Sequence, residues 1–327
     1  MCIFADSLKR VNDMFAEKLK YAVSKAVRSA ARTTWWMFRI TAAVSFAMFL
    51  LKYTGILTWV ATAVSPLFNL FGLPGSAALA YVSVYFINVY SCIAVVSTIN
   101  LTARELTILG TMTLAAHSMI LESAVQHKTG TSRGYVYAVR TISSLALGLL
   151  LNLLLPGRPD YSAVAATPLS EVPLFMIQGN FGALFVEWLT GLARLSVIMT
   201  LLIFALNILQ RSLYEFGIME KIAKVMSPLL KMFGLDPSTS FLWIVANLAG
   251  LSYGAAAMLD ELQRGSISRW NINLLNTHIG ISHSNLEDLT LMSALGGTWY
   301  ILLLSRWAMA ALLVWTVRLV RPRFLLT

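Results

Sequence analysis

Two stretches of this chain decide its fold: residues 65–76 read SPLFNLFGLPGS, and residues 227–238 read SPLLKMFGLDPS. They share seven of twelve residues at a separation of 162 positions. A second pair follows, AHSMILE at 116–122 and SHSNLED at 282–288, where the separation has grown to 166. One short insertion near residues 263–268 explains the difference. The chain therefore contains two copies of one unit, which in an apolar protein is typical of transporters.

The amino-acid composition indicates whether the chain folds in water or in a lipid bilayer. Of the 327 residues, 57% are hydrophobic and 12% are charged, whereas about 25% are charged in a soluble domain. Nearly uncharged stretches reach or approach the roughly 20 residues that span a bilayer as a helix; they are residues 40–51, 56–102, 106–121, 142–156 and 195–210. The segments of alternating polarity that a transmembrane barrel needs are absent from the sequence. We therefore predict an all-α, polytopic membrane protein.

Positive charge is placed at the ends of the apolar region. The net charge is +10, and basic residues cluster at 9–32 and again at 318–323. The positive-inside rule then puts both termini in the cytoplasm, in a multi-pass protein of the inner (plasma) membrane. We expect the basic ends to attract anionic membrane lipids, and we expect no nucleic-acid partner. Apolar residues at helical spacing predict an interfacial helix over residues 5–30.

The duplication divides the chain into five regions. They are a basic cytoplasmic leader (1–34), the first repeat (35–156), a connector (157–186), the second repeat (187–320) and a cytoplasmic tail (321–327). Residues 55–76 contain no Lys or Arg, whereas 211–238 contain four. Equivalent segments should then lie on opposite sides of the membrane, which makes the repeat inverted. A parallel repeat of eight helices is the alternative.

An inverted pair needs an odd number of crossings in each copy, yet each copy has four apolar elements. We therefore predict three transmembrane helices and one re-entrant or broken helical hairpin per copy. Polar residues that a lipid-facing helix would not tolerate place the hairpins at 104–127 and 271–297.

Broken helices in these hairpins are predicted to form the functional site, because interrupted backbone can replace water around a solute. The candidate substrate-binding residues are Asn88, Ser91, His117, Ser118, Asn247, Tyr253, His283, Ser284 and Asn285. Glu122 and Asp288 are candidates for coupling to protons or sodium. The alternatives are that the histidines cap free carbonyls, that the carboxylates end their segments at the interface, and that the small and hydroxyl residues serve helix packing.

Other kinds of site find little support in the sequence. We expect no metal site, because His278 and His283 would point about 140° apart on a continuous helix and no Cys lies near them in the sequence. We also expect no cofactor and no enzymatic activity, since HxE and CxxC patterns are missing. Two cysteines, Cys2 and Cys92, cannot cross-link a fold of this size.

The quoted stretches resemble the Gate-domain, or nucleoside-recognition, membrane proteins, a group that includes spore maturation proteins and the membrane halves of ferrous-iron transporters. The resemblance covers most of residues 35–320. It implies two Gate repeats, inverted, with paired hairpins around a central solute site. The iron transporters carry a Gly-Cys-Asn-Val-Pro-like turn, whereas residues 86–92 read FINVYSC, which argues against an iron substrate.

Together these features predict a transporter that moves a small polar or anionic solute by alternating access, a nucleoside-like solute being one candidate. The alternative is a non-transporting membrane partner that serves envelope or spore maturation or lipid handling. The general habits of inverted-repeat carriers suggest a homodimer.

Overall fold

The computed structural model describes residues 2–157, 159, 161, 167–177 and 179–321, and the side chains among them from residue 16 onward together with that of residue 14. Helices form nearly all of this part, and it contains no strand. The first copy comprises α1 (Cys2–Tyr53), α2 (Ile56–Asn69), α3 (Ala77–Phe86), α4 (Val89–Val96), α5 (Ala103–Ala116), α6 (Met119–Lys128) and α7 (Arg133–Leu154). A 3₁₀ turn, η1 (Leu169–Glu171), lies in the connector.

The second copy repeats the same succession of helices. It comprises α9 (Phe181–Glu215), α10 (Ile218–Met232), η2 (Pro237–Thr239), α11 (Ser240–Leu248), α12 (Leu251–Gln263), α13 (Arg269–Ser282), α14 (Asp288–Ala294) and α15 (Trp299–Val320). The ends of α5 and α13, and those of α7 and α15, are separated by the same distance along the chain as the two His-Ser motifs. The starts of α2 and α10 are separated as the two Ser-Pro stretches are. The internal duplication therefore holds for whole helices and not only for short motifs.

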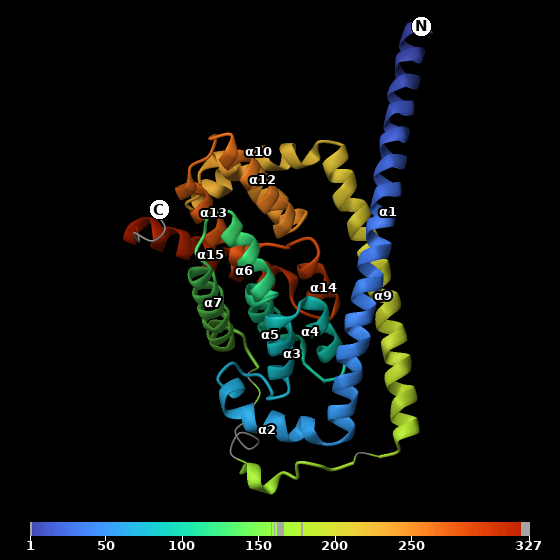
Figure 1. Ribbon diagram of the computed structural model, residues 1–327, viewed down its shortest axis with the longest axis vertical. Helices are drawn as coiled ribbons and strands as arrows, with labels where there is room; N and C mark the ends of the chain where they lie inside the picture. Colours follow the sequence, from blue (N-terminus) through green and yellow to red (C-terminus); the bar gives the residue numbers. More distant parts are fainter. Residues whose placement is uncertain (1, 158, 160, 162–166, 178, 322–327) are drawn as a thin grey trace.

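The two copies are inverted relative to each other. Helix α1 runs down the molecule to α2 at one end, whereas α9 runs up beside it to α10 at the other end (Figure 1). Contacts along this pair confirm the antiparallel direction: Trp188 Nε1 donates to Ser45 Oγ over 2.8 Å, and the Arg211 guanidinium lies 5.8 Å from the centre of the Tyr21 ring. The predicted inverted repeat is thus confirmed, and the parallel arrangement is excluded.

The re-entrant hairpins are α3–α4 and α11–α12. The Ser91 hydroxyl donates to the Ser83 carbonyl over 3.0 Å, and a Cβ built on Gly254 would lie 2.7 Å from the Ala246 Cβ. In both pairs the two residues would be about 12 Å apart along a continuous helix. Each copy therefore turns back on itself just after residue 86 or residue 248.

The prediction that residues 104–127 and 271–297 form the hairpins was wrong. Helices α5 and α6 follow each other in one direction (Figure 1), and Ala103–Lys128 is long and apolar enough to cross a membrane. So are the other four candidate spans, Ala16–Tyr53, Arg133–Leu154, Phe181–Glu215 and Trp299–Val320. Three of the five candidate spans lie in the first copy and two in the second, and each copy contains one of the two hairpins. Their assignment failed because the polar side chains of α5 and α13 face the protein interior and never meet lipid.

The leader is not a separate unit. Helix α1 is unbroken over 52 residues, about 78 Å at 1.5 Å per residue, which is far longer than the roughly 30 Å of a bilayer core. Its N-terminal part projects alone from the bundle (Figure 1). The predicted interfacial helix over 5–30 is therefore a straight extension of the first span, and its apolar positions before residue 14 lie outside the described side chains. The connector is also shorter than predicted, since α9 already begins at Phe181; most of the tail lies outside the described residues.

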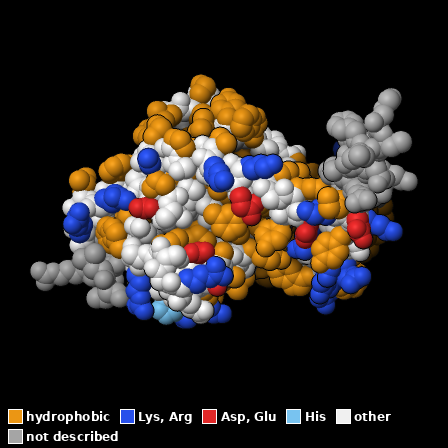
Figure 2. Space-filling view, turned by 90° about the horizontal axis from the view of Figure 1, so that it is seen from above, with side chains coloured by type: hydrophobic (Ala, Val, Ile, Leu, Met, Phe, Trp, Pro, Cys, Tyr) orange, Lys and Arg blue, Asp and Glu red, His pale blue; other side chains and the backbone are white. Residues whose placement is uncertain are grey.

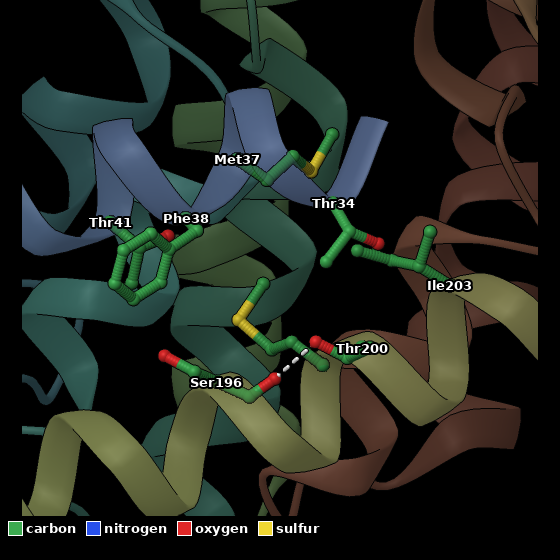
Figure 3. A pocket seen from close by; sticks show the side chains of 8 residues that line it. Thr34, Met37, Phe38, Thr41, Ser196, Thr200 and Ile203 are labelled. Carbon is green, nitrogen blue, oxygen red and sulfur yellow. Dashed lines mark hydrogen bonds between the residues drawn. The ribbon is translucent and has the colours of Figure 1, made fainter. Parts of the chain in front are cut away.

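Small polar residues mark the seam between α1 and α9. A cavity of about 20 Å³ lies there, lined by residues of both helices that include Thr34, Thr41 and Ser196 (Figure 3). Its volume is about that of one water molecule. The hydroxyls of Thr34 and Thr41 have no hydrogen-bond partner among the described residues.

Charge is distributed unevenly along the molecule. Lys and Arg side chains gather on the end from which α1 projects (Figure 2). Helix α10, at this end, carries Lys221, Lys224 and Lys231, whereas α2 at the other end carries no charged residue. The charge contrast between the two matching segments therefore coincides with the two ends of the structure.

At residue 72, in the motif quoted first, glycine is required both by the backbone conformation and by the lack of space for a side chain. Its φ is +63°, and a Cβ there would lie 2.2 Å from the Asn152 Oδ1 atom. That amide is fixed by bonds to Leu70 and Arg104. We expect Gly72→Ala to lower the free energy of unfolding by roughly 2 to 4 kcal/mol.

Gly217 is a matched control for this prediction. It has the same φ of +63°, but the nearest atom to its Cβ would be 3.6 Å away. Gly217→Ala should therefore cost only the conformational part, about 1 to 2 kcal/mol. Unfolding in detergent measures both variants, and equal losses would show that the contact with Asn152 is unimportant.

Candidate functional site

Both long crossings in the middle of the bundle are broken at equivalent residues. Between α5 and α6, His117 is extended and Ser118 has a φ of 45°. Between α13 and α14, His283 is extended and Ser284 has a φ of 57°. A left-handed serine costs about 1 to 2 kcal/mol, so the surrounding contacts must hold both breaks in place.

An arginine stabilises each break. Arg140 of α7 donates to the carbonyls of Ala115 (3.1 Å) and His117 (2.8 Å). Arg306 of α15 donates to the carbonyls of Ile281 (3.4 Å) and His283 (3.1 Å). Every residue of the first set matches one of the second in the repeat. Both arginines are fully buried; they satisfy carbonyls that lose their partners where the helices are interrupted.

Four side chains meet between the two breaks, and we call them the central cluster: His117, Glu122, His283 and Asp288. His117 Nε2 lies 3.1 Å from Glu122 Oε1 and 3.2 Å from Asp288 Oδ2. His283 Nε2 lies 3.1 Å from the same Glu122 oxygen, and the two imidazole rings are 4.7 Å apart. Glu122 also pairs with Arg140 over 2.7 Å. Two histidines and two carboxylates that match in the repeat thus converge at one point.

The tips of both hairpins attach to the breaks. The Ser118 N–H donates to the Val84 carbonyl at the end of α3 (2.8 Å). In the second copy the Asn285 N–H donates to the Asn247 carbonyl (2.9 Å). The Asn285 side chain bridges Asn247 Oδ1 (2.6 Å) and Arg306 (2.8 Å).

A further link joins the first hairpin to the second break, because the Tyr90 hydroxyl of α4 donates to Glu287. Movement of the first hairpin would therefore shift Glu287, the residue next to Asp288 of the central cluster.

Eight of the residues predicted from sequence come together here. They are His117, Ser118, Glu122, Asn247, His283, Ser284, Asn285 and Asp288. Asn88 and Ser91 lie at the tip of the first hairpin, where each side chain caps the backbone of the other; this arrangement fits the packing alternative. Tyr253 does not join the site, since it is 68% exposed on α12.

The sequence argument missed three members of the site, Arg140, Arg306 and Tyr90. Arginine side chains usually reach water at the ends of spans, whereas these two are fully buried. A usable signal was present, because they are separated by as many positions as the two histidines. Tyr90 has no comparable signal.

A hollow of about 650 Å³ opens on one side of the second hairpin, between α11–α12 and the α1–α9 pair. Among the described residues, its lining includes Lys25, Arg32 and Arg211 but no carboxylate. Ala249, also in the lining, lies two residues from Asn247 along the chain. The first hairpin differs, because α4 packs directly against α1.

Comparison with known proteins agrees with a location in a membrane. The chain is 28% identical over 290 residues to YvoD of Bacillus subtilis, which is described as an uncharacterized membrane protein; the match covers 88% of this chain and 90% of the relative. The chain is a membrane protein. No family model matches it, so the resemblance to Gate-domain proteins stays a prediction, and no solved structure matches it.

Proposed function

We propose that the protein is a secondary transporter that moves a small polar or anionic solute by alternating access. The hairpins α3–α4 and α11–α12 act as its two gates, and the breaks at His117 and His283 form the site between them. A nucleoside-like solute remains one candidate. We expect no enzymatic activity.

The difference between the two hairpins carries this proposal. In an inverted repeat, equivalent segments face opposite sides of the membrane, and exchanging their conformations exchanges the side that is open. The first hairpin is packed against α1, and the second is separated from the α1–α9 pair by the hollow. Such a difference between equivalent hairpins is expected of a carrier that is open to one side of the membrane.

The hollow supports a solute with negative or polar groups. Three of its described lining side chains are basic, and none of them is acidic. Tyr214, Phe241 and Tyr253 add aromatic surface that could stack on a planar group. By the positive-inside rule the open side is the cytoplasmic side of the plasma membrane, and both termini are cytoplasmic.

A second function has one observation in its favour. Asn88, His117, Asn247 and His283 are each at most 9% exposed, which also suits a non-transporting membrane partner in envelope or spore maturation or lipid handling.

Flux into proteoliposomes separates the two functions. Uridine, succinate, inorganic phosphate and glycerol 3-phosphate would first be ranked by their effect on the melting temperature, because a ligand of the folded state raises it. We expect at least one of them to be taken up. Asn285→Ala should slow that uptake by about 10-fold or more, because Asn247 and Arg306 lose a buried partner.

Thr316→Ala is the control, since Thr316 is exposed on α15 and its hydroxyl donates within its own helix, to the Leu312 carbonyl. It should transport normally. Absence of any uptake, together with a partner protein that co-purifies at fixed ratio, would exclude the transporter and favour the second function.

A further inference from the structure

The central cluster holds two imidazoles and two carboxylates in an arrangement that transport of an anionic solute does not require. We propose that His117, Glu122 and His283 bind one divalent first-row transition-metal ion at the interface of the two copies, with Asp288 next to it.

The hydrogen bonds of the two histidines decide which nitrogen is free. His117 Nδ1 lies 2.9 Å from the Leu114 carbonyl, and His283 Nδ1 lies 2.6 Å from the Ile279 carbonyl. A carbonyl only accepts, so each Nδ1 carries the proton and each neutral ring presents an Nε2 lone pair to the cluster. Metal-binding histidines are held in this way in proteins, with the second nitrogen donating to a carbonyl.

Lone pairs facing carboxylates need a cation between them. Among the described residues, His117 Nε2 makes no hydrogen bond, although two carboxylate oxygens lie within 3.2 Å of it. Three carboxyl groups (Glu122, Glu287 and Asp288) and two guanidinium groups (Arg140 and Arg306) meet around the two breaks. A bound cation gives His117 Nε2 a partner and separates His283 Nε2 from Glu122 Oε1, which lies 3.1 Å from it.

The spacing suits a small ion. Neighbouring ligand atoms in a tetrahedral site with bonds of about 2.0 Å are roughly 3.3 Å apart. The three measured nitrogen–oxygen distances of the cluster are 3.1, 3.1 and 3.2 Å. One ligand atom each from His117, Glu122 and His283 lies within 4.8 Å of the others. Two imidazoles favour zinc, copper, iron or nickel over magnesium or calcium, which prefer oxygen ligands.

Arg140 positions the key carboxylate. It pairs with Glu122 Oε2 and so leaves Oε1, the oxygen shared by both histidines, directed at the ion. Along the sequence, His278 and His283 are the two histidines closest to each other in the second copy. The pair that converges comes from two different copies, and His278 instead bonds Trp243 and Ser282.

The inference deepens the proposed function, since it names the ion at the proposed coupling residues, but its test does not need transport. The full-length protein, purified through a tag without histidine, would be stripped with a chelator and given zinc or cobalt. Metal retained after desalting would be counted by mass spectrometry. We expect about one ion per chain, and for cobalt the intense visible absorption of a tetrahedral site.

Variants assign the ion to the cluster. His117→Ala and His283→Ala should each weaken zinc binding by roughly 100-fold or more, since loss of a mere outer-shell partner already costs 10- to 100-fold. His127→Ala, which changes a histidine outside the cluster, should bind as the unmodified protein does. Glu122→Gln tests the cluster if the alanine variants fail to fold, because glutamine is nearly equal in size to glutamate.

Binding of less than a stoichiometric ion by the unmodified protein would overturn the inference, and so would equal binding by the His117→Ala and His127→Ala proteins. The two proposals fail separately: metal binding without flux removes only the transporter, and flux without metal binding removes only the ion.

Discussion

Replacing Arg140 with Gln is expected to lower the free energy of unfolding by about 3 to 5 kcal/mol, the cost of breaking a buried ion pair from one side. The variant leaves Glu122 without its guanidinium partner at 2.7 Å. It also removes the donors to the carbonyls of Ala115 and His117. These carbonyls lie at a helix break from which water is excluded, so no solvent can replace the lost bonds.

Arg264→Gln is the matched control, because Arg264 forms an ion pair with Asp260 at 2.8 Å but its side chain is 66% exposed. Such a surface pair contributes about 0.3 to 0.5 kcal/mol. Unfolding by heat or denaturant in detergent would compare the two proteins. A loss for Arg140→Gln as small as that for Arg264→Gln would mean that the arginine does not hold the break.

Cysteine labelling is expected to distinguish the two hairpins by a factor of at least ~10, because reaction with a maleimide follows access to the thiol. Tyr253 and Ser91 occupy equivalent positions of the two copies, yet Tyr253 is 68% exposed in the hollow and Ser91 is fully buried. In a protein with Cys2→Ser and Cys92→Ala, Tyr253→Cys should react quickly with a membrane-impermeant maleimide added on the open side. Ser91→Cys should be protected.

The same pair tests alternating access directly. A transported solute that drives the carrier to its other state should slow labelling of Tyr253→Cys and expose Ser91→Cys to reagent on the opposite side. Labelling of both positions at one unchanging rate, with and without solute, would show that the asymmetry between the hairpins is static.

Much of the architecture was predictable, because membranes restrict what a chain can do. A bilayer requires apolar helices of a minimum length, so composition alone indicated the fold class. The absence of basic residues from 55–76 and their presence in 211–238 predicted the inversion, since charge is costly to move across a membrane. Both predictions agree with the antiparallel course of α1 and α9 (Figure 1).

The assignment of the hairpins was not predictable by the same reasoning. The polar residues of α5 and α13 seemed incompatible with a crossing, yet they are buried between the two copies. Meanwhile the apolar run at 77–96 looked long enough to cross but turns back after Phe86. Hydropathy measures what a side chain would cost in lipid, and it cannot tell whether a segment faces lipid or protein.

The amino-acid sequence was sufficient to establish the duplication, the membrane environment and the opposite orientation of the two halves, because repetition, hydropathy and charge are properties of the chain as written. Only the folded arrangement brought His117 to His283 and buried Arg140 and Arg306 beside them. Contacts between residues so far apart depend on how the two copies pack together, and no local pattern encodes that packing.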